Sequence, residues 1–197
     1  MKYSPVKQHR SIRLKDYDYT QPGAYFVTIV TRNRACLFGD VVEGKIRLSN
    51  LGEIVRRDWQ AIAEHFHHTE PDVFVVMPNH VHGIIFIEVG ARHAVPLRSP
   101  STINDSTEHF ERFGKPVSGS IPTIVRSFKS VVTKDINELR HTRGASIWQR
   151  NYFEHVIRDE ESLNRIRQYI LDNPARWEFD RENPATVSPE SEDAWRG

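Results

Sequence analysis

The stretch VVMPNHVHGIIFIE, from Val75 to Glu88, decides the fold expected for this chain, because two histidines interrupt a long apolar run. Side chains two positions apart in a β-strand point to the same face of the sheet, so His80 and His82 should lie together. The apolar residues on either side of them are consecutive, which is typical of a strand in the middle of a covered sheet. Two histidines buried there need polar partners.

Strand and helix patterns alternate around this stretch. β-branched and aromatic runs predict strands within residues 23–34, 72–77 and 146–159, and a short hairpin within 37–50. Apolar residues at three- and four-residue spacing predict helices over about 50–66, 121–140 and 158–174. This order favours an α+β fold with helices packed on a mainly antiparallel sheet, and a ferredoxin-like arrangement is its simplest form.

The length of 197 residues favours a single domain with a substantial core. We expect this domain to span residues 1–180. Residues 89–119 are rich in Ser, Thr, Pro and Gly without a sustained period, which indicates a long loop inside the domain. Residues 181–197 are polar and contain prolines, which predicts a flexible C-terminal tail.

Composition excludes several classes of protein. The net charge is +1, and no apolar run approaches the 18 residues of a membrane span. The first twenty residues lack the apolar core of a secretory signal, so we expect a soluble, cytoplasmic protein. Cys36 is the single cysteine, which excludes an internal disulfide and a cysteine-based zinc cluster. A metal ion would therefore need histidine, carboxylate or amide ligands.

A second pair of polar residues follows near the end of the last predicted helix. Tyr169 and Asn173 are four residues apart, so they share one helix face. A tyrosine oxygen can attack a phosphodiester, a bound cation can orient the phosphate, and the Asn173 amide oxygen could complete the metal site. The plainer interpretation has Tyr169 packed in the core and Asn173 capping the helix before Pro174.

Three motifs in order, MPNHVHGIIF, WQRNYFEHVIR and RIRQYILDNPARW, resemble the REP-associated tyrosine transposases, relatives of the single-tyrosine transposases of the HUH class. The similarity runs from about Gly23 to Trp177. It implies a ferredoxin-like HUH domain that cuts and rejoins single-stranded DNA beside imperfect hairpin repeats, using Mg²⁺ or Mn²⁺. It also implies that His80 and His82 are metal ligands, that Asn173 is the third ligand, and that Tyr169 is the nucleophile that forms a 5′-phosphotyrosine.

The resemblance covers further residues in the second motif, where a recurrent stretch has no agreed role. These candidate accessory residues are Trp148, Gln149, Glu154, His155 and Arg158. Tyr152 lies in the same stretch and is the rival nucleophile. Because a tyrosine in a strand is usually packed, we rank Tyr152 below Tyr169.

Basic residues are concentrated in two segments, which suits a polyanionic partner. Residues 112–150 hold eight Lys or Arg against two Asp or Glu, and the first 34 residues hold seven against two. Candidate contacts to a DNA backbone are Arg126, Lys129, Lys134, Arg140, Arg13 and Lys15.

Other functions stay open at this point. The chain could be a domesticated hairpin DNA-binding protein without cleavage activity, or a metal-dependent hydrolase of small phosphoesters. It could also be an α+β domain with two buried core histidines. The target DNA sequence, the preferred metal and the choice between monomer and homodimer do not follow from the residues.

Overall fold

The computed structural model describes residues 17–88, 117–191 and 195. The expectations for Arg13 and Lys15, and for most of the loop at 89–119, lie outside these residues.

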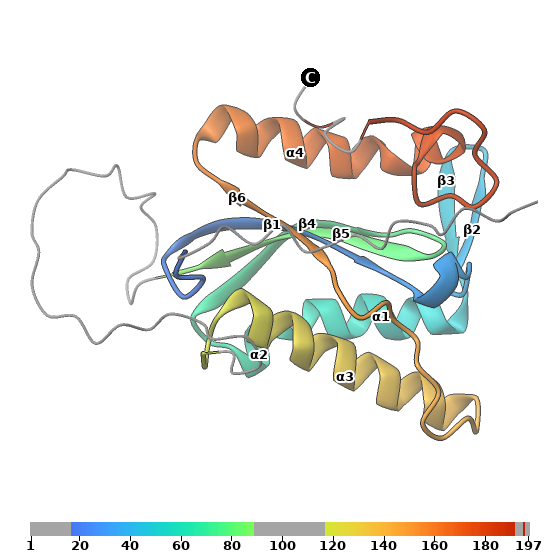
Figure 1. Cartoon of the computed structure of the whole chain (residues 1–197), viewed down its shortest axis with the longest axis horizontal. Coiled ribbons are helices and arrows are strands. Elements are labelled where there is room, and N and C mark those ends of the chain that lie inside the picture. The colour runs from blue at the N-terminus through green and yellow to red at the C-terminus, as the bar shows by residue number, and fades with distance from the viewer. Residues whose placement is uncertain (1–16, 89–116, 192–194, 196–197) are drawn as a thin grey trace, which may run out of the picture.

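A four-stranded antiparallel sheet forms the centre of the molecule (Figure 1). Its strand order is β4-β5-β1-β6. The strands are β1 (Gly23–Val30), β4 (Thr69–Val76), β5 (His80–Ile87) and β6 (Phe153–Ile157). A helix connects β1 to β4 and another connects β5 to β6, which gives the split βαβ arrangement of the ferredoxin-like fold. The α+β fold with a mainly antiparallel sheet is therefore confirmed, and β5 is a central strand as its sequence predicts.

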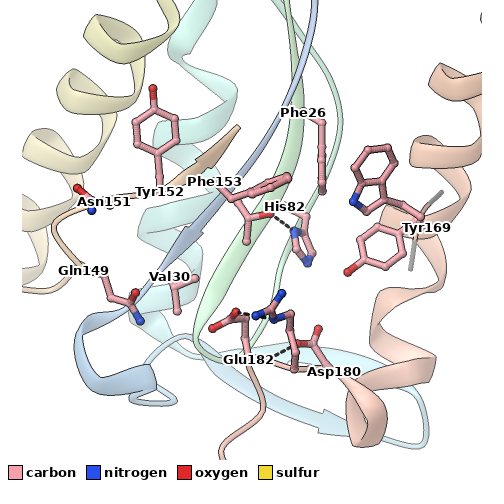
Figure 2. Close-up of a pocket in the computed structure, with 13 residues that line it drawn as sticks. Phe26, Val30, His82, Gln149, Asn151, Tyr152, Phe153, Tyr169, Asp180 and Glu182 are labelled. Atoms are coloured by element: carbon pink, nitrogen blue, oxygen red, sulfur yellow. Dashed lines mark hydrogen bonds and ion pairs between the residues drawn. The ribbon is translucent and has the colours of Figure 1, made fainter. Parts of the chain in front are cut away.

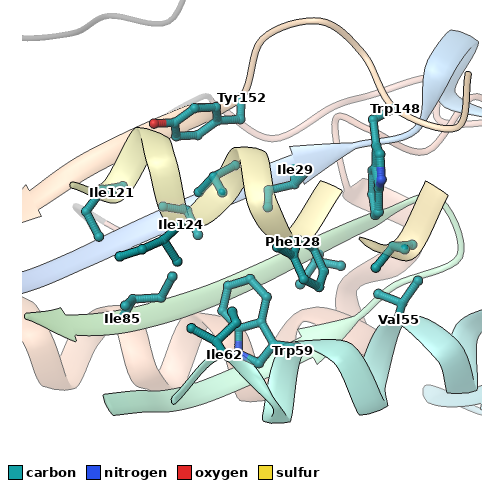
Figure 3. Close-up of a cluster of buried hydrophobic side chains, with 14 of the residues drawn as sticks. Ile29, Val55, Trp59, Ile62, Ile85, Ile121, Ile124, Phe128, Trp148 and Tyr152 are labelled. Carbon is teal, nitrogen blue, oxygen red and sulfur yellow. The ribbon is translucent and has the colours of Figure 1, made fainter. Parts of the chain in front are cut away.

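Three helices cover one face of this sheet, namely α1 (Asn50–Gln60), α2 (Ile62–His65) and α3 (Ile121–Leu139). The larger core lies between them and the sheet (Figure 3). Trp59 is fully buried there and packs edge-on against Phe128, with ring centroids 5.3 Å apart. It reaches β5 because residue 83 is a glycine: a Cβ atom at Gly83 would lie 2.2 Å from the Trp59 ring.

A single helix, α4 (Glu160–Asp172), covers the opposite face. It begins where the Asp159 carboxylate accepts a hydrogen bond from the Ser162 backbone N–H at 2.7 Å. The α-helix ends at Asp172, just before Pro174 as expected, but the chain stays helical beyond it. Because proline is tolerated in the first turn of a helix, the chain continues as the 3₁₀ helix η2 (Asn173–Phe179). Its return toward the sheet places Asp180 close to β5.

Smaller elements also follow the sequence, with one difference. The expected hairpin is β2 (Gly39–Val42) and β3 (Lys45–Leu48), and both turn residues, Glu43 and Gly44, have positive φ. A short 3₁₀ helix, η1 (Arg32–Arg34), precedes it. We expected the next strand to begin after Pro71, yet Pro71 lies inside β4. An edge strand accepts proline because one side of its backbone has no partner strand.

The polar segment after Asp180 predicted a flexible tail, but its first residues are packed. Glu182 is 4% exposed, and its backbone carbonyl accepts a hydrogen bond from Asn79 Nδ2 at 2.7 Å. Asn183 is also buried and donates to the carbonyl of Trp177. Among the described residues, no helix is long and apolar enough to cross a membrane.

Candidate metal and tyrosine site

His80 and His82 lie side by side on the face of β5 that α4 covers. Their ring centroids are 4.4 Å apart, and their side chains are 0% and 4% exposed. β5 is paired on both edges, by β1 and β4, so both histidines sit in the most constrained part of the sheet. The shared face predicted from the H-x-H spacing is confirmed.

Hydrogen bonds to the Nδ1 atoms fix how the two imidazoles are presented. Asn79 Nδ2 donates to two backbone carbonyls, those of Arg34 and Glu182. The Asn79 Oδ1 atom therefore faces His80, lies 2.9 Å from its Nδ1 and accepts the Nδ1 proton. His82 Nδ1 is 2.8 Å from the hydroxyl of Thr28, its partner across the strand pair. The Nε2 atoms are left to face α4 and η2.

Burial keeps both histidines neutral. Burial lowers the pKa of His80 to about 3, and the nearby Asn173 side chain opposes this shift only in part. Burial also lowers the pKa of His82 well below its usual value; proximity to His80 lowers it further, while the charge of Asp180 opposes the change. Neutral imidazole is the form that binds a metal ion.

Two side-chain oxygens, from Asp180 and Asn173, approach the histidines from the side of α4 and η2. Asp180 is 5% exposed, and its Oδ2 lies 3.6 Å from His80 Nε2, while its Oδ1 accepts a hydrogen bond from the Glu182 backbone at 2.6 Å. Asn173, at the junction of α4 and η2, is 3% exposed. The candidate ligand atoms of His80, His82 and Asp180 lie within 4.8 Å of one another.

Several buried polar atoms of the described residues have no hydrogen-bond partner, and four of them belong to this site: His80 Nε2, His82 Nε2, Asn173 Oδ1 and Asp180 Oδ2. An unsatisfied buried polar atom costs about 1–3 kcal/mol. Two neutral imidazoles with a carboxylate and an amide oxygen form a donor set that fits a divalent cation. The group His80, His82 and Asp180 could therefore hold a metal ion.

Tyr169 completes the group from the last turns of α4. Its ring centroid is 5.3 Å from that of His82, and Figure 2 shows its hydroxyl end directed toward the histidine. The ring also stands perpendicular to Phe26, at 6.2 Å. Burial raises the pKa of Tyr169, and the negative charge of Asp180 raises it further. The phenol is therefore protonated at neutral pH and must lose its proton if the oxygen is to act as a nucleophile.

Comparison with known proteins places this geometry in context. No family model matches the chain. An uncharacterized protein of Haemophilus influenzae is 40% identical over 178 residues, covering 89% of this chain and 93% of its own length. The "putative REP-associated tyrosine transposase" of the same organism is 26% identical over 160 residues, covering 81% of this chain and 74% of its own. The chain is a distant homologue of the REP-associated tyrosine transposases.

A solved structure of a REP-associated tyrosine transposase bound to a REP hairpin shares the fold. The TM-score is 0.54 at 18% identity, and the match covers 87% of this chain and 74% of the other. The antiparallel sheet with helices packed on it is therefore the fold of that structure. The resemblance given by the three sequence motifs is confirmed.

The candidate accessory residues of the second motif separate between the two faces of the sheet. Trp148 is buried in the larger core beside Phe38, and Glu154 pairs with Val27, whose side chain belongs to the same core. Gln149 lines the pocket that contains Tyr169 and His82. His155 pairs with Phe26, on the face of the sheet that α4 covers. Arg158 is exposed at the end of β6.

The rival tyrosine has different surroundings. Tyr152 is 8% exposed and belongs to the larger core, near Ile121 and Ile124 (Figure 3). Figure 2 shows its ring directed away from His82, although its residue lines the edge of the same pocket. The geometry favours Tyr169 over Tyr152 as the residue that acts with the histidines.

The candidate DNA contacts on α3 lie on the other side of the sheet from Tyr169 (Figure 1). Arg126, Lys134 and Arg140 are exposed. Lys129 is half-buried, and its Nζ donates to the backbone carbonyls of Gln149 at 2.6 Å and Arg150 at 3.1 Å. Lys129 therefore holds the segment before β6 in place and is not presented to solvent as the other three are.

Three residues of the site were not identified from the sequence: Asp180, Thr28 and Asn79. Asp180 lies at the start of the polar segment, and the signal for its packing is the pair of aromatic residues Trp177 and Phe179 just before it. Asn79 directly precedes the H-x-H motif, but no spacing in the sequence assigns it a role. Thr28 is placed by strand register alone.

Proposed function

We propose that this chain is a metal-dependent single-stranded DNA endonuclease and strand transferase that acts at hairpin repeat DNA through a 5′-phosphotyrosine. The observation that carries the proposal is the contact of the Tyr169 ring with His82, at a point where four buried polar atoms converge. A tyrosine beside a metal site is the arrangement that phosphodiester transesterification needs.

The metal would be held by His80, His82 and Asp180, with Asn173 as a further oxygen ligand. Mg²⁺ or Mn²⁺ bound there would act as a Lewis acid on a phosphoryl oxygen of the scissile phosphate. Asn79 and Thr28 would keep both Nε2 atoms available for this role, because each holds the Nδ1 atom of one histidine.

The protein residues would carry out the transfer itself. The Tyr169 oxygen attacks phosphorus, a phosphotyrosine bond forms, and the bond to the 3′ oxygen of the neighbouring nucleotide breaks. The phenol gives up its proton, and the released oxygen gains one to become a 3′-hydroxyl, so protons balance. Attack by this hydroxyl, or by another one, reverses the step and reseals the strand. No nucleotide cofactor is needed because the phosphotyrosine keeps the energy of the phosphodiester.

The charges around Tyr169 are mixed. Arg181 lines the same pocket, but Asp180 and Glu182 line it as well, and Arg176 is paired with Glu190. A bound divalent cation would offset these carboxylates where a phosphate has to bind. The exposed α3 residues Arg126, Lys134 and Arg140 would contact parts of the DNA remote from the cleaved bond. Because such contacts release counterions, binding should weaken steeply as salt is raised.

The test is covalent capture. The purified chain is incubated with Mn²⁺ and labelled single-stranded DNA that carries the hairpin repeats found beside its own gene, and a denaturing gel is run. We expect a metal-dependent protein–DNA band that Tyr169→Phe abolishes and Tyr152→Phe retains. Hairpin binding without any adduct or nick, with either metal, would instead favour the non-catalytic DNA-binding function.

A further inference from the structure

We infer that the indole of Trp195 occupies a subsite for one unpaired nucleobase, in the pocket that Tyr169 also lines. The identity of the ligand as single-stranded DNA rests on the proposed function. The existence of the subsite rests on the aromatic side chains that surround the indole.

Trp195 is packed, although most of residues 184–191 are exposed. Its side chain is 6% exposed, whereas Val187 is 95% exposed. The indole lies 4.4 Å from the His155 ring and 6.1 Å from the Phe26 ring, measured between centroids. It lines the same pocket as Tyr169 and His82. A flat, bicyclic ring about the size of a purine therefore already fills a place beside the candidate nucleophile.

Phe26 connects this place to the metal and tyrosine site. Its ring centroid lies 5.5 Å from that of His82 and 6.2 Å from that of Tyr169. The same ring also contacts Phe153, at 6.2 Å, and Trp195. A base stacked where the indole lies would share Phe26 with the tyrosine. The phosphate of the same nucleotide would then fall on the side of Tyr169 and Arg181, which line the pocket.

The chemistry of the walls suits a base. Phe26, Phe153 and His155 offer ring faces and edges from the neighbouring strands β1 and β6. Stacking on aromatic side chains is how proteins hold unpaired bases, and it tolerates any base because each has a π-face. The base and the indole cannot occupy one place, so DNA that binds in this subsite must displace Trp195.

The first experiment follows the indole directly. The full chain is labelled with 5-fluorotryptophan, and the resonance of Trp195 is assigned from the spectrum of Trp195→Phe. The probe is the hairpin oligonucleotide with unpaired flanks, added without divalent metal so that binding is observed without cleavage. We expect the Trp195 resonance to move to a solvent-exposed position, while those of the core residues Trp59 and Trp148 stay unchanged.

The second experiment asks whether a base takes the place of the indole. The same oligonucleotide is made with an abasic position at each unpaired nucleotide in turn, and its affinity is measured. We expect one position at which loss of the base weakens binding about tenfold, as stacking energies predict. In His155→Ala this loss should largely disappear. Trp195→Ala should bind the intact oligonucleotide more tightly than wild type, and Trp195→Phe should lie between them.

A purely structural role for Trp195 gives the opposite results. The indole would stay buried in the DNA complex, and Trp195→Ala would lower both the melting temperature and the affinity. If these results are found while the adduct with Tyr169 still forms when Mn²⁺ is added, the subsite is refuted and the proposed function stands. If no oligonucleotide binds and no adduct forms with Mn²⁺, the subsite and the proposed function are both refuted.

Discussion

Thr28 and His82 face each other across the pair of strands β1 and β5, and the Thr28 hydroxyl lies 2.8 Å from His82 Nδ1. The contact joins residues 54 positions apart in the sequence. It matters for the site because a histidine binds metal through one nitrogen while the other nitrogen sets the ring orientation and the tautomer. Asn79 plays the same part for His80, because its Oδ1 accepts the Nδ1 proton of that ring.

Replacing Thr28 by valine should weaken metal binding without disturbing the sheet. Valine keeps the branched shape that suits a strand but has no hydroxyl to accept the Nδ1 proton of His82. Loss of such a partner lowers metal affinity by about 10–100-fold. Isothermal titration with Mn²⁺ measures the change, and Thr28→Ser should retain most of the affinity. An unchanged dissociation constant in Thr28→Val would show that the hydroxyl does not orient His82.

Metal binding should raise the melting temperature, and Asp180→Asn should remove most of that effect. The ion would satisfy buried atoms that have no hydrogen-bond partner among the described residues, and it binds the folded state alone. A thermal scan over a series of Mn²⁺ concentrations measures the shift. The control is Asp172→Asn, which removes an exposed carboxylate near the end of α4. If Asp180→Asn keeps the full shift, the ion is held without this residue.

Sequence patterns that involve near neighbours along the chain were sufficient to predict much of this structure. The H-x-H alternation places His80 and His82 on one face, and the four-residue spacing brings Tyr169 and Asn173 to the same side of α4, where both meet the histidines. Burial on both faces of β5 follows from its consecutive apolar residues. These features are local because strand and helix periodicities determine where each side chain points.

Features that depend on contacts between distant segments did not follow from the sequence. Asp180 reaches His80 because the chain continues past Pro174 as η2, whereas proline after a helix usually signals its end. The role of Thr28 depends on the register between β1 and β5. The sequence predicts that the basic residues of α3 lie together on one exposed face. Lys129 nevertheless turns inward, because two backbone carbonyls accept its hydrogen bonds.

Gly83→Ala should destabilise the fold although it adds only one methyl group. The new Cβ atom would lie 2.2 Å from the ring of Trp59, which is fully buried and stacks on Phe74. Overpacking of this kind costs about 1–3 kcal/mol. Urea unfolding followed by tryptophan fluorescence measures the loss. The double variant Gly83→Ala with Trp59→Phe should recover part of it relative to Trp59→Phe alone, because the smaller ring leaves space for the methyl group.

Lys129 should make the stability of the protein rise with pH in alkaline solution. Burial lowers the pKa of its ammonium group from 10.5 to about 8. Between pH 8 and 10.5 the folded state has therefore lost this proton while the unfolded state still binds it. Because the unfolded state binds more protons in this window, the free energy of unfolding contributed by this group increases with pH.

The size of the effect follows from the same shift. A difference of one pKa unit corresponds to about 1.4 kcal/mol, so the group contributes at most about 3 kcal/mol over the whole window. The measurement is urea unfolding of wild type and Lys129→Met at pH 7 and pH 10, since subtraction of the two proteins cancels the titration of other groups. Lys134→Met, an exposed lysine of the same helix, is the matched control. We expect the stability of wild type relative to Lys129→Met to rise by about 2 kcal/mol between these pH values. A difference that stays constant would mean that the ammonium group keeps its proton against the carbonyls of Gln149 and Arg150 throughout.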